Sequence, residues 1–583
     1  MGAIFGFIGQ RDDKILAQMQ NTLSHRGRSC NSITEPNFSM GYWSRDNSQP
    51  SQTPTSGIAK TENGIIGLAG FQTPGESDAV VDLNEIRRSL FAFTRLPDEL
   101  SGDFVVAAAS EDGDFFLGRD GSGSRTIYYA TFNNRFFFAT EPKAIWSTAG
   151  FPRKIDPNSV AKYLTFSFVP NKETMLRDVF ELPAGHLLHR SAQGDITIKR
   201  YFEFEKTDPA TPDNKDDWIQ KFRTVFGNSI RDRLALTAGD PHLFLSGGLD
   251  SSIVAAELKN QTQGSNRTIR SYSMHFGKDY PNELEFAKSV ADRVGTNHTE
   301  VLISPESFLP NLRKMVWHLD DPIGDPITMP NFSLAQSLEN ETDFVFNGEG
   351  GDPCFGGPKN IPMMLTHWYG QERDPLFREN AYLQSYRRAY EELDHLLAPW
   401  LDRRIDRTTL TSTLTPFFDC DQPKNLLDKL TAINIRLKGA HLILPKVERM
   451  LGAWNISPLS PLFSSEIVKF SFQIPSTMKL ERGIEKVILK NAYRDELPES
   501  VIARPKSGMR VPVHFWFQGE MKKYARHILS SRQIKRGGVF DHRRVKQLLK
   551  YNIEEGNGRY GMRLWMLLTF EIWRRIVIEG EAI

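Results

Sequence analysis

A glycine- and serine-rich segment, Ser246-Gly247-Gly248-Leu249-Asp250-Ser251-Ser252, follows an apolar stretch and opens a helical pattern. Backbone N–H groups left bare by glycine, next to the positive end of a helix, are suited to binding phosphate. The segment lacks the lysine of the GxxxxGK[ST] loop, which holds the β and γ phosphates of ATP. It therefore predicts a nucleotide site of another kind; the alternative is an ordinary strand-to-helix turn.

A second glycine segment, Gly348-Glu349-Gly350-Gly351-Asp352, also follows a short apolar run. In a parallel sheet both loops lie at the carboxyl ends of strands, where ligands of α/β folds bind. Asp250 and Asp352 then face one side of a triphosphate, and Mg²⁺ takes such hard oxygen ligands. We therefore predict Asp250 and Asp352 as metal ligands; as the alternative, both are turn or cap residues.

The elements that must position these loops alternate between strand and helix. Strands are expected at 242–245, 268–276, 299–303 and 343–346, and helices at 218–234, 250–259 and 281–294. Strands alternating with helices of this length indicate parallel βαβ units. Residues after about 364 are mostly amphipathic helix and are expected to cap or extend the sheet.

The first 204 residues have a different pattern. Short strands rich in β-branched and aromatic residues are expected at 3–8, 64–69, 104–109 and 135–139, with tight turns between them, which is typical of an antiparallel sheet-rich domain. The polar segment 205–216 contains two prolines and no apolar period, so we expect it to be a linker. The predicted domains are therefore 1–204 and 217–583, joined by the linker 205–216.

The composition excludes several classes of partner. Lys and Arg number 72 against 71 Asp and Glu, so no overall field attracts nucleic acid or an anionic membrane. We expect no membrane span, because no stretch of about 18 uncharged apolar residues occurs. Cys30, Cys354 and Cys420 form no CxxC pair, which favours a reducing compartment, with the cytoplasm as the default.

Further motifs extend over most of the chain: Gly118-Arg119-Asp120, Leu182-Pro183-Ala184-Gly185-His186, Asn282-Glu283-Leu284, Asp320-Asp321-Pro322 and Arg504-Pro505-Lys506. Together with the two glycine loops, they resemble the class B asparagine synthetase family. The resemblance implies an α+β N-terminal Ntn-type glutaminase-like sandwich domain, followed by an α/β ATP-pyrophosphatase domain with a parallel sheet and a helical C-terminal part. Such an enzyme uses ATP and Mg²⁺ to activate a carboxylate and releases AMP and pyrophosphate.

The same resemblance implies roles for individual residues. Lys506 is expected to stabilise charge on the α-phosphate, and Glu349 is expected to accept a proton from the attacking amine, or to orient Mg²⁺ or substrate. Contacts with ATP are expected from Leu245, Ser246, Gly247, Gly248, Asp250, Ser251, Ser252, Met274 and Gly348.

The N-terminal segment departs from the family pattern. Family glutaminases begin Met-Cys-Gly-Ile and use that cysteine as the nucleophile, whereas this chain begins Met1-Gly2-Ala3. Cys30 is internal and cannot present a free α-amine. Phe71 stands where the family holds glutamine with a carboxylate, and an apolar ring cannot replace that group. We therefore predict a degenerate N-terminal domain without glutaminase activity.

Without glutaminase activity, the amine is either free ammonia or part of the substrate. The second pattern is that of β-lactam synthetases and lasso-peptide macrolactam cyclases, where one pocket holds both reactants. β-lactam synthetases carry a tyrosine at the position of Glu349, which makes that class less favoured. The segment 456–464 has lost the charged residues of the family's LExRVPFLD, which indicates an altered pocket or interface; the alternative is neutral repacking.

The leading hypothesis is therefore intramolecular macrolactam or isopeptide closure on a peptide or small-molecule carboxylate, as in lasso-peptide cyclases of antibiotic biosynthesis. Its expected partners are a precursor peptide and the protease that processes it. The alternatives are an ammonia-dependent asparagine synthetase, a β-lactam synthetase-like cyclase and a catalytically silent binding protein that keeps only the fold.

Overall fold

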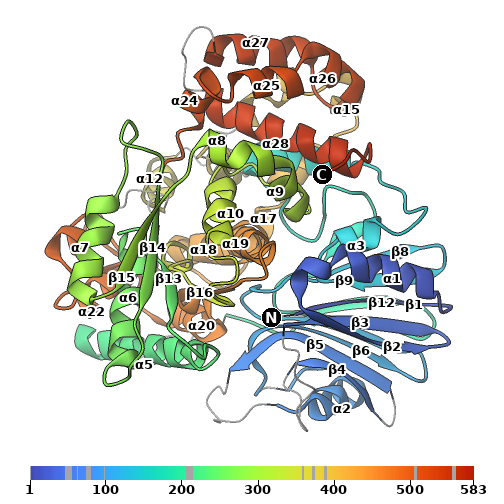
Figure 1. Cartoon of the computed structure of the whole chain (residues 1–583), viewed down its shortest axis with the longest axis horizontal. Helices are drawn as coiled ribbons and strands as arrows, with labels where there is room; N and C mark the ends of the chain where they lie inside the picture. Colours follow the sequence, from blue (N-terminus) through green and yellow to red (C-terminus); the bar gives the residue numbers. More distant parts are fainter. Residues whose placement is uncertain are drawn as a thin grey trace.

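The computed structural model describes residues 2–45, 56–61, 64–73, 81–97, 99–204, 214–357, 360–370, 374–385, 390–504, 509–553 and 560–583. Figure 1 shows three regions: an N-terminal domain rich in strands, a central domain of strands and helices, and a group of helices from the end of the chain. Within the described residues, no helix combines the length and the apolar character that a bilayer span requires.

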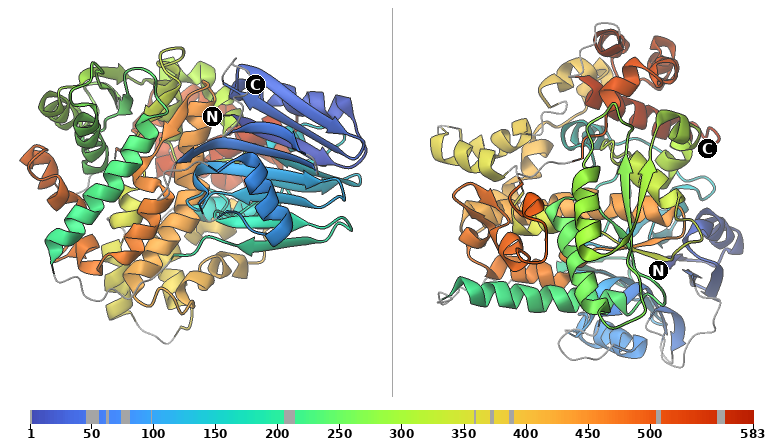
Figure 2. Two further views of the ribbon diagram at one scale, coloured as in Figure 1. Left: turned by 90° about the horizontal axis from the view of Figure 1, so that it is seen from below. Right: turned by 60° about the vertical axis from the view of Figure 1, so that its left-hand side comes forward.

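The N-terminal domain consists of two six-stranded antiparallel sheets. The first has the order β10-β8-β9-β1-β3-β2 and the second the order β12-β11-β7-β6-β5-β4. The bounds are β1 Ala3–Ile8, β2 Ser29–Glu35, β3 Phe38–Ser44, β4 Gly57–Thr61, β5 Gly64–Thr73, β6 Ser101–Ser110, β7 Phe115–Arg119, β8 Tyr128–Phe132, β9 Arg135–Ala139, β10 Val179–Glu181, β11 His186–Arg190 and β12 Ile196–Arg200. The left view of Figure 2 shows the two sheets stacked face to face.

Both faces of each sheet carry apolar residues, so each sheet packs against the other sheet on one face and against a helix on the opposite face. Ile4 and Met40 of the first sheet meet Val105 and Leu117 of the second in one buried cluster. Helices α1 (Asp13–Thr22) and α2 (Leu83–Phe93) cover the outer faces, where the apolar side of each helix joins the core. The result is the sandwich domain that the sequence predicts, with the hairpin β8–β9 closed by Asn133 and Asn134 at positive φ, as a tight primed turn requires.

The second domain contains a five-stranded parallel sheet with the order β15-β14-β13-β16-β17. The bounds are β13 His242–Phe244, β14 Arg270–His275, β15 Asn297–Leu302, β16 Phe344–Phe346 and β17 Ser457–Leu459. Helices α5 (Lys215–Leu234), α6 (Leu249–Thr262) and α7 (Leu284–Val294) share an apolar cluster with this sheet. The right view of Figure 2 shows these helices beside the sheet. The predicted fold class is confirmed, and the helical C-terminal part ends in α28 (Gly561–Val577).

Two details differ from the sequence prediction. Residues 205–213 of the expected linker lie outside the described residues, and its last two residues already belong to α5, capped by the Asn214 side chain. In addition, Ser457–Leu459 forms β17, although no strand was expected there, because the run is short and contains Pro458. Proline is tolerated there because β17 is an edge strand.

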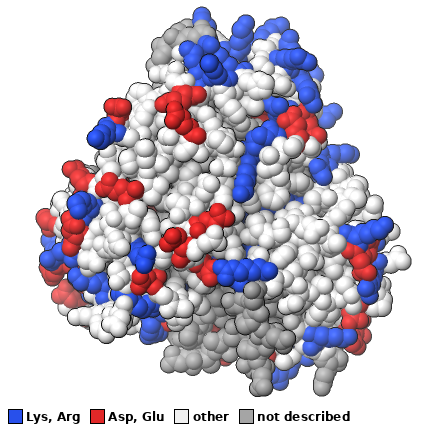
Figure 3. Space-filling view, in the orientation of Figure 1, with Lys and Arg blue, Asp and Glu red and all other residues white. Residues whose placement is uncertain are grey.

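Charged residues are distributed unevenly over the surface. Figure 3 shows Lys and Arg gathered at the top of the face in view, over the C-terminal helices, whereas both signs are mixed elsewhere. The chain as a whole has nearly equal numbers of basic and acidic residues, but this face carries a local basic region. Elsewhere on the face, no large area is covered by charges of one sign.

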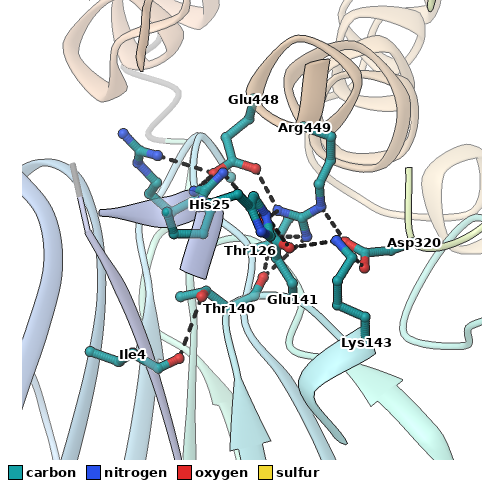
Figure 4. Close-up of polar contacts among 12 residues, drawn as sticks. Ile4, His25, Thr126, Thr140, Glu141, Lys143, Asp320, Glu448 and Arg449 are labelled. Carbon is teal, nitrogen blue, oxygen red and sulfur yellow. Dashed lines mark hydrogen bonds and ion pairs between the residues drawn. The ribbon is translucent and has the colours of Figure 1, made fainter. Parts of the chain in front are cut away.

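A buried network of charges joins the two domains (Figure 4). On the side of the second domain it begins with Glu448 and Arg449 of helix α19 (Leu444–Gly452). Arg26 pairs with Glu448, and Arg125 Nη1 lies 3.2 Å from the same carboxylate. These guanidinium groups hold the pKa of Glu448 at about 2, although burial opposes its ionisation.

The same network continues to the N-terminal domain through Glu141 and Lys143. Lys143 Nζ lies 2.5 Å from Glu141 Oε2 and 2.8 Å from Asp320 Oδ1, and Arg449 Nε lies 2.5 Å from Asp320 Oδ2. Arg449 also donates to the Thr140 carbonyl oxygen, 3.1 Å away. Because each of these charges has a partner, the burial cost of the network is offset only while all members are present.

We expect Glu448→Gln to lower the free energy of unfolding at pH 7 by about 3 kcal/mol, because it leaves buried guanidinium groups uncompensated. Urea titration at pH 7 measures the change. The control is Glu35→Gln, which removes an exposed pair with Lys60 and is expected to cost less than about 1 kcal/mol.

The pH dependence provides a second readout of the same variant. Since the pKa of Glu448 falls from 4.5 to about 2 on folding, its stabilisation is complete above pH 4.5 and is lost as the pH falls toward 2. The variant is expected to lose less stability over this range than the wild type. Equal acid sensitivity of the two proteins would contradict the assigned role.

Candidate functional site

The first glycine loop joins β13 to α6 and can form only with glycine at its second position. Gly247 has φ +74°, and a Cβ there would lie 2.4 Å from the Ala287 backbone nitrogen. The loop thus packs directly against the start of α7, and its bare backbone faces a cavity that Gly248 also lines. This is the arrangement of open N–H groups and helix N-terminus that binds phosphate.

The serine hydroxyls shape this loop from within. Ser251 Oγ accepts from the Ser246 N–H, 3.1 Å away, and lies 3.0 Å from Ser246 Oγ. Ser252 is buried and donates to the Gly248 carbonyl oxygen. Of the predicted ATP contacts, Ser246 and Ser251 face a cavity, whereas Ser252 and Leu245 are buried supports of the loop.

The second glycine loop is in direct contact with the first. A Cβ on Gly348 would lie 2.5 Å from the Ser251 backbone nitrogen, and one on Gly351 would lie 2.2 Å from Asp250 Oδ1. Gly350 has φ +115°, and a Cβ there would lie 2.3 Å from the Leu462 carbonyl oxygen. The glycines therefore let the two loops approach to contact distance, which brings Asp250 and Asp352 together as the sequence predicts.

The segment 456–464 supports the second loop from below. Its strand β17 pairs with β16, and Ser460 Oγ donates to Asn347 Oδ1 at 3.0 Å. Ser457, Leu459 and Ser464 are buried, and none of them is among the residues that line the cavities described below. This placement favours repacking beneath the loop over an altered pocket.

Lys486 bridges the two acidic residues and was not singled out in the sequence. Its Nζ lies 2.6 Å from Asp250 Oδ2 and 2.5 Å from Asp352 Oδ1. Lys486 is buried, has φ +55° and immediately precedes helix α22 (Val487–Ala492). Its contact partners lie more than a hundred residues away along the chain, and it belongs to no glycine loop. The spacing of residues in the sequence therefore could not identify it as a site residue.

A cavity of about 240 Å³ lies on one side of the first loop. Its wall combines the backbone of Gly247 and Gly248 with three basic side chains, Lys486, Lys490 and Arg504. Glycine N–H groups and convergent cations are the groups that bind phosphates. This cavity is suited to a pyrophosphate or polyphosphate group.

A second cavity, of about 230 Å³, lies where the two loops meet. Its described lining includes seven of the predicted site residues: Ser246, Asp250, Ser251, Met274, Gly348, Glu349 and Asp352. The structure therefore gathers the predicted contacts around two neighbouring cavities, with Gly247 and Gly248 on the first.

Glu349 lies among titratable groups that sequence reasoning did not identify. Lys446 of α19 is buried, and its Nζ lies 3.3 Å from Asp325 Oδ2. Burial opposes protonation of Lys446, but the carboxylates of Asp325 and Glu349 raise its pKa above the ordinary value. Glu349 therefore lies close to a buried ammonium that Asp325 holds in place.

The donor set for a divalent cation consists of Asp250 and Asp352. Both carboxylates converge on one point, which the Lys486 ammonium occupies, so their arrangement fits a cation. Among the described residues no group of three or more His, Cys, Asp or Glu side chains is arranged so that it could hold a metal ion. Mg²⁺ commonly binds through one or two carboxylates and completes its shell with phosphate oxygens and water, so these residues fit a cation that arrives with ATP.

Lys506 lies outside the described residues. The neighbouring described residues border both cavities: Arg504 lines the first and pairs with Glu283, and Met509 lines the second.

The place expected for a glutaminase nucleophile is closed. A Cβ on Gly2 would lie 1.9 Å from the Trp43 carbonyl oxygen and 2.7 Å from the Tyr42 ring. Phe71 is buried beneath the Arg233 guanidinium, which lies 5.5 Å from the ring centroid. Cys30 is a β2 residue, and burial raises the pKa of its thiol to about 11, so it is not a thiolate at neutral pH.

Comparisons with known proteins agree with this geometry. Residues 221–575 match the family model described as asparagine synthase, and residues 72–202 match the glutamine amidotransferase domain. The "Asparagine synthetase [glutamine-hydrolyzing] 1" of Bacillus subtilis (strain 168) is 26% identical over 514 residues, which cover 82% of this chain and 78% of that protein. The match to the amidotransferase model begins after Gly2 and Phe71.

Two further relatives are similar over most of their length. A "Putative asparagine synthetase [glutamine-hydrolyzing]" of Mycobacterium tuberculosis (strain ATCC 25618 / H37Rv) is 25% identical over 565 residues, covering 90% of this chain and 82% of that protein. "Amidase chry2" of Gibberella zeae is 20% identical over 551 residues, covering 83% of this chain and 80% of that protein.

We expect Gly351→Ala to lower the rate of ATP cleavage by roughly 100-fold, because its Cβ would displace the Asp250 carboxylate. Release of pyrophosphate measures the rate. Gly239→Ala is the control, since a Cβ there meets nothing within 4 Å. A Gly351→Ala protein with unchanged rate and unchanged stability would refute the need for close loop contact.

We also expect Lys486→Met to lower pyrophosphate release by roughly 100-fold, because it removes a fixed cation from the phosphate cavity. Lys215→Met is a matched control, since Lys215 forms an exposed pair with Glu481. Circular dichroism and thermal unfolding show whether both variants are folded. Retention of the wild-type rate by folded Lys486→Met would contradict this role.

Proposed function

Because this chain belongs to the asparagine synthase family, we propose that it activates a substrate carboxylate with ATP and joins it to an amine that does not come from glutamine. The enzyme class, an ATP-dependent carbon–nitrogen ligase that forms AMP, follows from the family. The amine source is the new element. One observation carries it: Gly2 has no side chain and no room for one beside the Trp43 carbonyl.

The first chemical step is formation of an acyl adenylate. A carboxylate oxygen of the substrate attacks the α-phosphorus of ATP, and the bond to the leaving pyrophosphate breaks. The glycine loop, Lys486, Lys490 and Arg504 are positioned to stabilise the charge on the leaving group. Mg²⁺, held by Asp250 and Asp352 together with phosphate oxygens, would supply further neutralisation of that charge.

The second step is attack of an amine on the acyl carbon. The new carbon–nitrogen bond forms, the bond to AMP breaks, and the amine loses a proton. Glu349 lines the cavity proposed for this step, and a carboxylate at this position can accept the proton. Lys506 is proposed to stabilise the α-phosphate in both steps.

The preferred version of this function places the amine in the substrate itself. A substrate that carries both groups needs no ammonia from the N-terminal domain, and holding both reactants in one cavity accelerates ring closure. The substrate class would be a peptide or small molecule that closes to a macrolactam or isopeptide, as in lasso-peptide cyclases. A precursor peptide and its processing protease are the partners proposed for this version.

A second version, ammonia-dependent asparagine synthesis, is favoured by Glu349. The residue matches the asparagine-synthetase state of the second loop, and the relatives described above carry that enzyme's name. Incubation with aspartate, ammonium, ATP and Mg²⁺ separates the two versions. Formation of asparagine and AMP in equal amounts would contradict the intramolecular version and support ammonia-dependent asparagine synthesis.

We expect no glutamate above background when the protein is incubated with glutamine, because Gly2 offers no nucleophile and the Cys30 thiol has a pKa of about 11. An enzyme-coupled glutamate assay measures the product, with Cys30→Ser as the matched variant. Glutamate release that Cys30→Ser abolishes would contradict the loss of glutaminase activity. The same preparation must release pyrophosphate with a suitable carboxylate, or the protein is not a synthetase.

A further inference from the structure

The helices near the end of the chain carry a charge that the total of the protein does not reveal. Residues 522–553 contain ten Lys and Arg residues and one acidic residue, Asp541. Since the whole chain has 72 basic and 71 acidic residues, the sequence outside this segment has more acidic residues than basic ones. The charge of the chain is therefore separated into one basic segment and a remainder that is acidic overall.

Three short helices form the basic segment: α25 (Lys522–Ile528), α26 (Ser531–Gly537) and α27 (His542–Ile553). Each helix turns an apolar side inward, where Ala525, Ile534 and Leu548 join the core cluster that also contains residues of α28. Figure 1 and the right view of Figure 2 show this group of helices projecting at one end of the molecule, away from the N-terminal domain.

The opposite sides of these helices carry cations that face solvent. Five basic side chains are exposed and form no ion pair within the part of the chain that the structure describes: Lys523, Arg532, Lys535, Arg543 and Lys546. Arg532 and Lys535 are three residues apart, as are Arg543 and Lys546, so each pair shares one face of its helix. These five side chains form the basic end of the protein.

Over the ranges that the structure covers, the ion pairs of these helices involve two other arginines. Arg536 Nη2 lies 3.1 Å from Glu579 Oε2, and Arg544 Nη2 lies 2.9 Å from Glu392 Oε2. Asp541 Oδ1 accepts from two backbone N–H groups at the start of α27. These acids therefore serve the fold of the helices and do not pair with the cations of the basic end.

An exposed tryptophan lies at the margin of the basic end. Helix α15 (Pro399–Asp402) lies against the segment between α26 and α27, and Trp400 Nε1 donates to the Gly538 carbonyl oxygen there. The polar edge of the indole is thus occupied, although 44% of the residue is exposed. The Arg404 guanidinium lies 5.2 Å from the ring centroid. An exposed indole beside cations is typical of proteins that meet a membrane–water interface.

The shape of this region favours a flat anionic surface over a nucleic acid. The cations come from three helices of a projecting end, and Figure 3 shows Lys and Arg gathered there, where a bilayer can approach without a groove. Nucleic-acid backbones are commonly held in a basic groove that follows them. In addition, the acidic remainder of the chain is repelled by an anionic surface, which turns the basic end toward it.

We propose that the basic end, with Trp400 at its margin, binds an anionic phospholipid surface and holds the enzyme there as a peripheral protein. Clusters of about four to eight Lys and Arg residues recognise anionic lipids. The attachment is reversible, because it rests on surface charges that salt screens. This proposal does not depend on the proposed function of the two cavities.

The test is co-sedimentation of the full-length protein with sucrose-loaded vesicles. Vesicles of phosphatidylcholine with about 30% phosphatidylserine are compared with vesicles of phosphatidylcholine alone, in about 0.1 M NaCl. We expect the anionic vesicles to be bound at least 10-fold more tightly. We also expect this binding to be lost in about 0.5 M NaCl, since salt shortens the range of the attraction.

One variant removes a cation from each of the three helices: Lys523→Gln, Lys535→Gln and Lys546→Gln combined. It is expected to weaken binding to the anionic vesicles roughly 100-fold, because each cation near the surface contributes roughly fivefold. These side chains are exposed and unpaired in the described chain, so thermal unfolding is expected to be unchanged.

The matched control changes three exposed lysines on other parts of the molecule to glutamine: Lys60, Lys199 and Lys288. It alters the net charge by the same amount and is expected to bind the vesicles as the wild type does. Trp400→Ala is expected to weaken binding roughly 10-fold, because it removes the apolar ring. Trp400→Phe keeps a ring but loses the hydrogen bond to Gly538, and it is expected to bind nearly as the wild type does.

Equal binding to both kinds of vesicle, or binding to neither, would overturn the proposal. A triple variant of the basic end that binds as tightly as its matched control would overturn it as well. The last arm adds a 40-nucleotide RNA of random sequence at a phosphate concentration equal to that of the anionic lipid. Retention on the vesicles supports the proposal, whereas displacement by the RNA would show that the basic end binds nucleic acid instead.

Discussion

The site depends on the confinement of one carboxylate, Asp250, between a glycine and a buried lysine. Gly351 leaves no space for a side chain beside Asp250 Oδ1, and Lys486 donates to the same carboxylate. This contact fixes the separation of the two glycine loops. Because the loops end neighbouring strands, β13 and β16, the geometry of the parallel sheet is transmitted directly to the phosphate cavity.

The N-terminal domain has no room for a side chain at Gly2 and is joined to the second domain by buried polar contacts. Its Arg119 uses all of its donors on buried acceptors, among them the Ala440 carbonyl of the π-helix η5 (Ile433–Ile443). The charges around Glu448 and Arg449 tie helix α19 to the same domain. Removal of the domain would expose these charges and release two helices that line the substrate cavity, which gives a physical reason for its retention.

The sequence predicted local features well because local physics determines them. Strand and helix periodicity identified both domains, and the glycine spacing placed Asp250 and Asp352 side by side. Lys486 was not predicted because its partners, Asp250 and Asp352, are distant in sequence and it belongs to no glycine-rich loop. Likewise, β17 was not predicted because its short run contains Pro458. The π-helix η5 (Ile433–Ile443) has no sequence period that distinguishes it from an ordinary amphipathic helix.

The central claim is that the two loops transfer AMP to a carboxylate while the N-terminal domain supplies no amine. Labelling both carboxyl groups of aspartate, or of a peptide substrate, with ¹⁸O tests it most directly, with hydroxylamine as the amine and glutamine absent. We predict that mass spectrometry finds one ¹⁸O atom in each AMP released, because an oxygen of the activated carboxylate stays on the α-phosphorus. Unlabelled AMP, ADP carrying no label with ¹⁸O in inorganic phosphate, or product formation that requires glutamine would contradict the account.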